Sequence, residues 1–209
     1  EGKTTVQTIV VKEEDLVVDA IAKNKLAVFT ISKEILDTEG KIVEVSAGRG
    51  FGISADGLVV VDGGLVPGKG TYYLKNDSGK FKADFVLVDK AGFSFLMVGD
   101  PVDGKSKIVF TVPAFGDISK MKIGQKILMV GSTISSYIFE GGSKDMKDIK
   151  INVTRSSAGG LVLNLDGEVL GIALYDDNKN FASIDAIVDA LKAFLNPATT
   201  TPAAPVLAP

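Results

Sequence analysis

Tight-turn signals recur along the middle of this chain and divide it into pieces of strand length. Asp-Gly and Gly-Gly pairs accept positive φ and favour tight hairpins. They occur at 56–57, 62–64, 103–104 and 166–167, with further turn residues at 67–68 and 76–79. A dozen short strands at regular spacing predict a β-sandwich or β-barrel. After one strand at 26–31, we expect strands at 42–46, 50–54, 58–62, 71–75, 81–88, 94–98, 107–111, 126–131, 134–139, 150–153, 161–164 and 169–175.

Helical patterns stand at the two ends of this strand-rich region. Three acidic residues at 13–15 precede apolar residues at helical spacing, which predicts a short helix there. Residues 183–195 are apolar on one helical face, Ser183 is a candidate N-cap, and Pro197 ends the pattern. We interpret residues 1–14 as an N-terminal arm and the Pro-, Ala- and Thr-rich residues 197–209 as a linker or stalk. One domain then spans 15–196.

Composition limits the chemistry that the chain can perform. It contains no cysteine, which excludes disulfides and thiolate nucleophiles, and no histidine, the commonest general base. The net charge of −3 and the scattered lysines argue against a nucleic-acid partner. No apolar run is long enough to cross a bilayer. The carboxylate clusters at 145–148 and 176–178 lack a calcium-loop pattern, so we expect no metal and no cofactor.

One segment carries a family resemblance. Residues 154–172, TRSSAGGLVLNLDGEVLGI, resemble the GNSGGPLLNLDGEVIGI stretch of HtrA/Deg-type serine proteases. Residues 48–57 are similar to the family's GSGFIISPDG, and 59–66 lie where it has IVTNNHVV. The order and spacing of such matches hold over about 15–195. The resemblance implies an all-β, chymotrypsin-like fold of two antiparallel six-stranded β-barrels, with short N- and C-terminal helices. The lobes would span about 25–100 and about 105–182, with a cleft between them.

The resemblance also implies where the catalytic triad would stand. The family's histidine falls on Gly64, its aspartate on Phe93 and its serine on Ala158, and an oxyanion-hole glycine falls on Ser156. Gly64 has no base, Phe93 cannot orient an imidazole, and Ala158 has no hydroxyl to attack a carbonyl. The sequence therefore predicts a pseudoprotease that is not an enzyme.

Three functions stay open at this point. The first is a binding or scaffolding module that holds a protein or extended peptide in the inter-barrel cleft, since strand addition needs no triad. The second is a residual serine-type peptidase with Ser156 or Ser157 as a rearranged nucleophile and a lysine as its base. The third is a purely structural, stalk-borne domain. The resemblance implies possible homo-oligomers through the arm at 1–14. With the stalk-like tail, it also implies an extracytoplasmic protein whose leader or anchor has been removed.

The aromatic pattern on one predicted strand separates the binding and structural alternatives. Phe93, Phe95 and Met97 alternate, so they share one strand face. They could line an apolar groove, but we expect them to pack in the core. A cleft that these side chains fill would favour the structural domain, and an open cleft with unpaired strand edges would favour binding.

Overall fold

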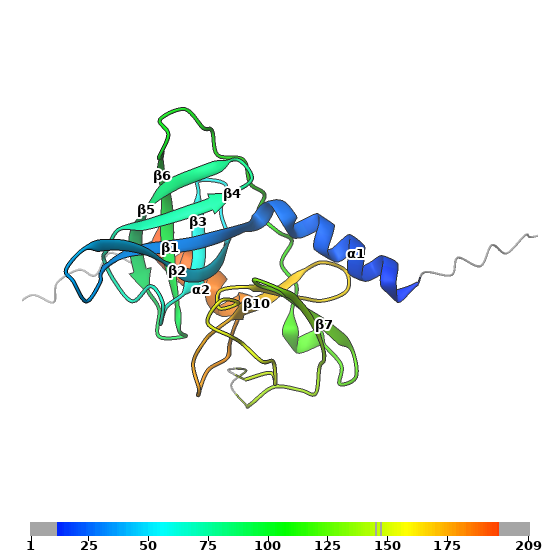
Figure 1. Cartoon of the computed structure of the whole chain (residues 1–209). Coiled ribbons are helices and arrows are strands. Elements are labelled where there is room, and N and C mark those ends of the chain that lie inside the picture. The colour runs from blue at the N-terminus through cyan, green and yellow to red at the C-terminus, as the bar shows by residue number, and fades with distance from the viewer. Residues whose placement is uncertain (1–11, 145, 147, 197–209) are drawn as a thin grey trace, which may run out of the picture.

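The chain folds into two β units framed by two short helices (Figure 1). The computed structural model describes residues 12–196 apart from 145 and 147. The helices are α1 (Glu13–Asn24) and α2 (Ile184–Leu195), with short 3₁₀ turns at Lys25–Ala27 and Ile118–Lys120. The strands are β1 (Val28–Leu36), β2 (Ile42–Gly52), β3 (Leu58–Asp62), β4 (Tyr72–Asn76), β5 (Gly79–Val88), β6 (Phe93–Pro101), β7 (Lys126–Val130), β8 (Ile134–Ile138), β9 (Leu161–Leu163), β10 (Val169–Ala173) and β11 (Phe181–Ser183).

The first unit is a closed barrel with strand order β1-β2-β3-β6-β5-β4. It closes because β1 pairs with both β2 and β4. Apolar alternation places Phe29 and Ile31 of β1 inside, while Thr30 between them is exposed. All five residues of β3 are buried, and this strand matches its predicted bounds. The two predicted strands at 42–46 and 50–54 are one continuous strand, β2.

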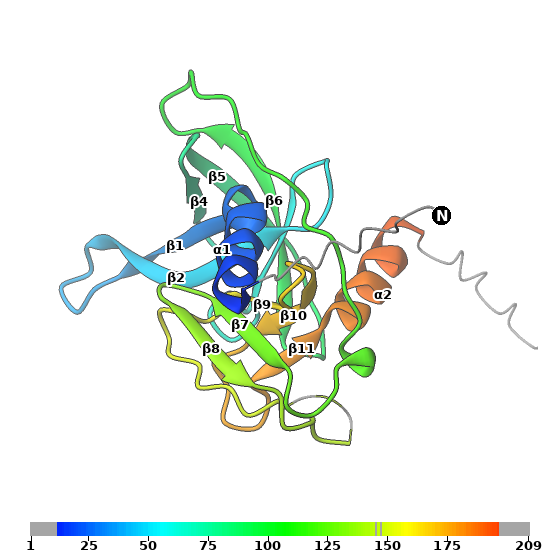
Figure 2. The ribbon, with the colours of Figure 1, turned by 90° about the vertical axis from the view of Figure 1, so that its right-hand side faces the viewer.

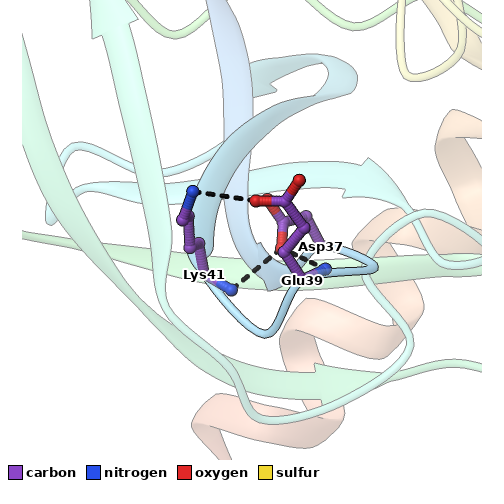
Figure 3. Close-up of polar contacts among 3 residues, drawn as sticks. All are labelled: Asp37, Glu39 and Lys41. Carbon is purple, nitrogen blue, oxygen red and sulfur yellow. Dashed lines mark hydrogen bonds and ion pairs between the residues drawn. The ribbon is translucent and has the colours of Figure 1, made fainter.

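The β1–β2 hairpin projects beyond the barrel in both ribbon views (Figures 1 and 2). Its tip is organised by one carboxylate. Asp37 Oδ1 accepts hydrogen bonds from the backbone N–H groups of Glu39 at 2.8 Å and Lys41 at 2.9 Å. The Lys41 ammonium pairs with Glu39 at 2.8 Å across the same turn (Figure 3). The aspartate thus holds the tip as an Asx-turn does.

The second unit is an open five-stranded sheet with order β11-β10-β9-β7-β8. The second six-stranded barrel predicted from the resemblance is not confirmed. Two predicted strands, 107–111 and 150–153, do not form. Val109 gives its N–H to the Ser78 hydroxyl, and Thr111 gives its N–H to the Leu26 carbonyl, so these amides join no strand ladder. Lys150 has a φ of +54°, which strand geometry does not allow.

The helices anchor this second sheet. The Asn24 side chain, at the end of α1, donates to the carbonyl groups of Ala20 and Gly167, each at 2.8 Å. The Ser183 hydroxyl caps α2 by accepting from the Ala186 N–H, as predicted. No helix in the described part of the chain is long and apolar enough to cross a membrane. The predicted linker, and the arm up to residue 11, lie outside the described residues, and α1 begins at Glu13, two residues inside the predicted arm.

Candidate functional site

The segments that carry the three predicted triad positions meet where the two units touch. Asp62 and Phe93 are direct partners in the β3–β6 ladder, and the next residue, Gly63, donates its N–H to the Gly92 carbonyl at 2.8 Å. Gly64 is exposed beyond this junction. Ala158 is fully buried in the same apolar cluster as Leu65 and Val66. The fold therefore brings positions 64, 93 and 158 to one region.

The Phe93 ring belongs to the core and lines no groove. It is fully buried, and its centroid lies 5.4 Å from that of Phe95, within the range of favourable aromatic pairs. Met97, on the same strand, is partly buried and packs against the same cluster. The expectation that these three side chains pack in the core is confirmed.

A buried carboxylate that the sequence analysis did not single out lies at the centre of this region. Asp62 is 1% exposed. Its Oδ1 accepts from the Leu65 N–H at 2.9 Å, and its Oδ2 accepts from the Tyr175 N–H at 2.7 Å. A Cβ placed on Gly64 would lie 3.2 Å from Asp62 Oδ1, so a side chain at that position would face this carboxylate.

Two opposing effects act on the pKa of the Asp62 carboxyl. Burial raises the pKa of the Asp62 carboxyl, and the nearby charge of Asp176 raises it further. Hydrogen bonds from the backbone N–H groups of Tyr175, Leu65 and Gly64 lower it, but burial is the larger effect. Sequence reasoning treated residues 62–64 as turn residues. The Asx-type bond to Leu65 fits that interpretation, whereas the bond to Tyr175 depends on the tertiary fold.

The backbone around Ala158 is folded into a closed turn. The N–H groups of Ser157 and Ala158 both donate to the Thr154 carbonyl, at 3.0 and 2.9 Å. The Ala158 carbonyl accepts from the Arg49 N–H at 2.7 Å. The Ala158 amide is therefore occupied within the turn, and it does not point free into the region beside Gly64, as an oxyanion donor must.

A cluster of hydroxyl groups lies on the outer side of this turn. Ser156 Oγ lies 3.1 Å from Ser132 Oγ and 3.2 Å from Thr154 Oγ1. Ser157 Oγ lies 2.9 Å from Thr154 Oγ1 and is 2% exposed as a residue, whereas Ser156 is exposed. Of the two serines predicted as alternative nucleophiles, only Ser156 is accessible. Neither of its side-chain contacts is a base, and neither is the lysine that the dyad requires.

An unpaired strand edge leads to this cluster. In the part of the chain that the structure describes, residues 42–46 of β2 pair with β1 on one side only, because β3 takes up pairing at Gly50. Glu34 of β1 gives its N–H to the Thr71 carbonyl, away from its partner Glu44. The backbone groups of Glu44 and of the alternate residue Ser46 therefore point to the free edge.

A depression lies at the end of this edge. It measures about 340 Å³ and is lined by Ser46, Thr154, Arg155 and Ser156. No sequence pattern indicates this free edge of β2, because it arises where β2 extends beyond the end of β3. Within residues 12–196, positions 145 and 147 aside, no three potential ligand side chains come together as a metal site would require.

Comparisons with known proteins show that this chain is similar to HtrA-type serine proteases. No family model matches the chain. A probable periplasmic serine endoprotease, DegP-like, from Brucella suis biovar 1 is 30% identical over 144 residues, which cover 61% of this chain and 27% of the relative. Serine protease HTRA2, mitochondrial, from Bos taurus is 26% identical over 181 residues, which cover 76% of this chain and 38% of that relative.

Solved structures support the same fold. HtrA-type protease AlgW with decapeptide superimposes with a TM-score of 0.69 at 14% identity, covering 89% of this chain and 68% of that one. This chain thus has the HtrA protease fold. Its described residues form one closed barrel and a second sheet. It spans only about a quarter to two fifths of the length of the curated relatives it matches.

The comparisons correct one prediction from the sequence. The absence of the triad side chains predicted that the protein is not an enzyme. The relatives are named serine endoproteases, which contradicts that prediction. The correspondence of Gly64, Phe93 and Ala158 with triad positions stays a prediction.

Proposed function

We propose that this HtrA-type protease-like domain binds an extended segment of a partner protein as an added strand on the free edge of β2. The observation that carries the proposal is the free edge of residues 42–46, whose outward backbone groups lead to the depression at Ser156. An exposed edge offers unpaired N–H and C=O groups to an incoming strand. HtrA-type protease AlgW, which has the same fold, has been solved with a decapeptide, and this supports peptide binding in general.

The proposal keeps Gly64, Phe93, Ala158, Ser156 and Ser157 as the positions that correspond to the family's triad and oxyanion loop. It concerns binding, which depends on the backbone and on the shape of the region between the units. It also places the protein outside the cytoplasm, as the names of the DegP-like relatives say for those proteins.

A strand-edge variant with a matched control tests the binding. The probe is a fluorescent decapeptide of alternating Thr and Val, read by anisotropy. Ser46→Pro removes an outward N–H from β2, and proline is tolerated on edge strands. Ser136→Pro makes the same change on β8. Phe139 of this edge gives its N–H to Gln125, and Gly131 gives its N–H to Thr133, so the odd-numbered residues of β8 bond to β7. The N–H of Ser136 therefore points outward.

The two variants separate the possible results. We expect Ser46→Pro to weaken binding about tenfold, the cost of one or two lost backbone hydrogen bonds, and Ser136→Pro to leave it unchanged. Loss of binding in Ser136→Pro alone would assign the peptide to β8. A wild-type protein that does not bind the probe would overturn the proposal.

A second candidate function is peptide cleavage with Ser156 as the nucleophile. It is favoured by the exposure of Ser156 and its hydroxyl contacts with Thr154 and Ser132. Fluorophosphonate labelling with intact-mass detection, beside a casein cleavage assay, tests it. An adduct and cleavage that both disappear in Ser156→Ala would support this candidate. Cleavage that survives in Ser156→Ala, or no adduct and no cleavage, would overturn it.

A further inference from the structure

Four neighbouring strands of the barrel carry three cations and one hydroxyl in a single transverse row. Thr30 of β1 lies opposite both Arg49 of β2 and Lys75 of β4, and Lys75 lies opposite Lys80 of β5. Directly opposite residues of antiparallel strands share one face of the sheet, with Cβ atoms about 5 Å apart. Arg49, Thr30, Lys75 and Lys80, called the cationic row below, therefore lie together on the outer wall. These residues are scattered in the sequence, and only the strand register brings them together.

One end of the cationic row is neutralised within the protein. The Lys80 ammonium lies 2.5 Å from the Glu44 carboxylate and 4.3 Å from the centroid of the Tyr73 ring. The Lys80 ammonium, more than any other group, lowers the pKa of the Glu44 carboxyl, as expected for a carboxylate held against a cation. Glu44 therefore offsets the charge of Lys80, but it forms no ion pair with Arg49 or Lys75.

Arg49 and Lys75 form no such close pair, although the charge of Lys75 makes a smaller contribution to lowering the pKa of Glu44. Within the described residues, neither side chain forms an ion pair with a carboxylate. Arg49 is half-buried and donates from its guanidinium to Thr30 Oγ1 at 3.0 Å. Burial lowers the pKa of the Arg49 guanidinium, which reflects the cost of desolvating an unpaired charge. An anionic ligand would relieve this cost.

The cationic row lies in concave surface. One depression of about 290 Å³ is lined by Thr30, Ser32, Ser46, Lys75 and Lys80, among other residues. A second of about 400 Å³ shares Thr30 and Lys75 and continues to Lys25, Asn76 and Val109. Glu44 lines the first depression and Asp77 lines the second, so the charge of the lining is mixed, with the lysines outnumbering the carboxylates. The two depressions share Thr30 and Lys75 and are together called the groove; Arg49 lines neither depression and reaches the groove through its hydrogen bond to Thr30.

We propose that the cationic row binds an extended acidic peptide segment, whose carboxylates lie between Arg49 and Lys75 above the Thr30 hydroxyl. An arginine fork matches a carboxylate with two parallel hydrogen bonds, and the lysine adds a point charge. A peptide fits better than a nucleic acid. The chain is net negative, Glu44 lies inside the patch, and the Tyr73 ring is already covered by Lys80 rather than open for base stacking. The groove borders residues 44–46 of the β2 edge, but this proposal rests on side-chain charge and not on strand addition at that edge.

Charge-neutral variants test the proposal against a matched control. The probes are fluorescent hexaglutamate and hexaglutamine, read by anisotropy at low and at high salt. Lys75→Gln and the pair Arg49→Gln with Lys75→Gln remove the unpaired charges. Lys69→Gln with Lys122→Gln removes the same total charge from exposed sites outside the groove. Arg49→Lys retains the positive charge but loses the guanidinium that can form two parallel hydrogen bonds with one carboxylate.

We expect hexaglutamate to bind, to weaken at high salt, and to bind more tightly than hexaglutamine. Lys75→Gln should weaken it about threefold, the double variant in the row about tenfold or more, and the control pair hardly at all. Because Lys75 is exposed, its variant keeps the proposal testable if Arg49→Gln does not fold. Equal losses in the row and control pairs, or no hexaglutamate binding, would overturn the proposal. Tighter binding of an oligothymidylate that the row variants abolish would assign the groove to nucleic acid instead.

Discussion

The carboxylate of Asp62 and the backbone N–H of Tyr175 join the barrel to the second sheet by a hydrogen bond of 2.7 Å. Asp62 ends β3, and Tyr175 follows β10. The Asp62 carboxylate is buried, and it lies beside the exposed Gly64, the position predicted for the catalytic histidine. The region between the two units is therefore organised by an acid that accepts backbone hydrogen bonds.

Asp62 should make the stability of the protein depend on pH in a particular direction. Its pKa is raised on folding, so the folded state binds the proton more tightly than the unfolded state. The stability that this group contributes is therefore present at low pH and is lost as the pH rises through its folded pKa. We expect the unfolding free energy of the wild type, relative to Asp62→Asn, to fall in urea titrations as the pH rises above the ordinary aspartate pKa of about 4.

An exposed aspartate gives the opposite sign and serves as the control. Hydrogen bonds from the Ser106 side chain and nearby backbone lower the pKa of Asp103 to about 2. Its contribution is present above the ordinary carboxyl pKa and is lost as the pH falls toward 2. Relative to Asp103→Asn, the wild type should lose stability on acidification. The same direction of change for both residues would contradict the burial of the Asp62 charge.

Gly159 should tolerate no side chain. Its φ is +80°, and an added Cβ would lie 1.8 Å from the Arg49 carbonyl oxygen. Gly159→Ala therefore combines left-handed strain with a backbone clash, and we expect it to cost about 3–5 kcal/mol in urea unfolding. Gly104→Ala is the matched control, since its φ is +68° and the space around it is open. It should cost only about 1–2 kcal/mol. Equal losses in the two variants would show that the close contact with Arg49 is absent.

The hairpin tip should loosen locally when Asp37 is replaced. Asp37→Ala removes the acceptor for two backbone N–H groups in an exposed turn. We expect global stability to fall by about 1 kcal/mol or less, and hydrogen exchange to accelerate at Glu39 and Lys41. Glu39→Gln removes only the ion pair with Lys41 and should leave exchange nearly unchanged. Fast exchange at these amides in the wild type would contradict the turn geometry.

The cap of α2 provides a fourth prediction. Ser183 Oγ accepts from the Ala186 N–H at 3.3 Å, and Ser183→Ala leaves that donor unsatisfied. The expected loss is about 1 kcal/mol of unfolding free energy. Ser183→Thr restores the acceptor and should recover most of it. Failure of threonine to rescue would mean that the hydroxyl acts by a contact other than the cap.

Local patterns predict the elements of this fold better than they predict its site. The apolar run of β3, the cap at Ser183 and the core position of Phe93 follow from spacing and side-chain type, and all are confirmed. The second barrel was inferred from the resemblance, and the amides of 107–111 find partners outside any ladder. The role of Asp62 and the cationic row depend on residues far apart in sequence, so no local pattern could indicate them.

All six strands of the closed barrel lie within the continuous segment from Val28 to Pro101. During synthesis from the N-terminus, this unit can therefore close before the second sheet leaves the ribosome. Until Tyr175 arrives, Asp62 lacks one of its hydrogen-bond donors and remains at the open end of β3. The docking of the two units is then the step that buries this charge. The rate of that late step should respond to pH, even if closure of the barrel does not.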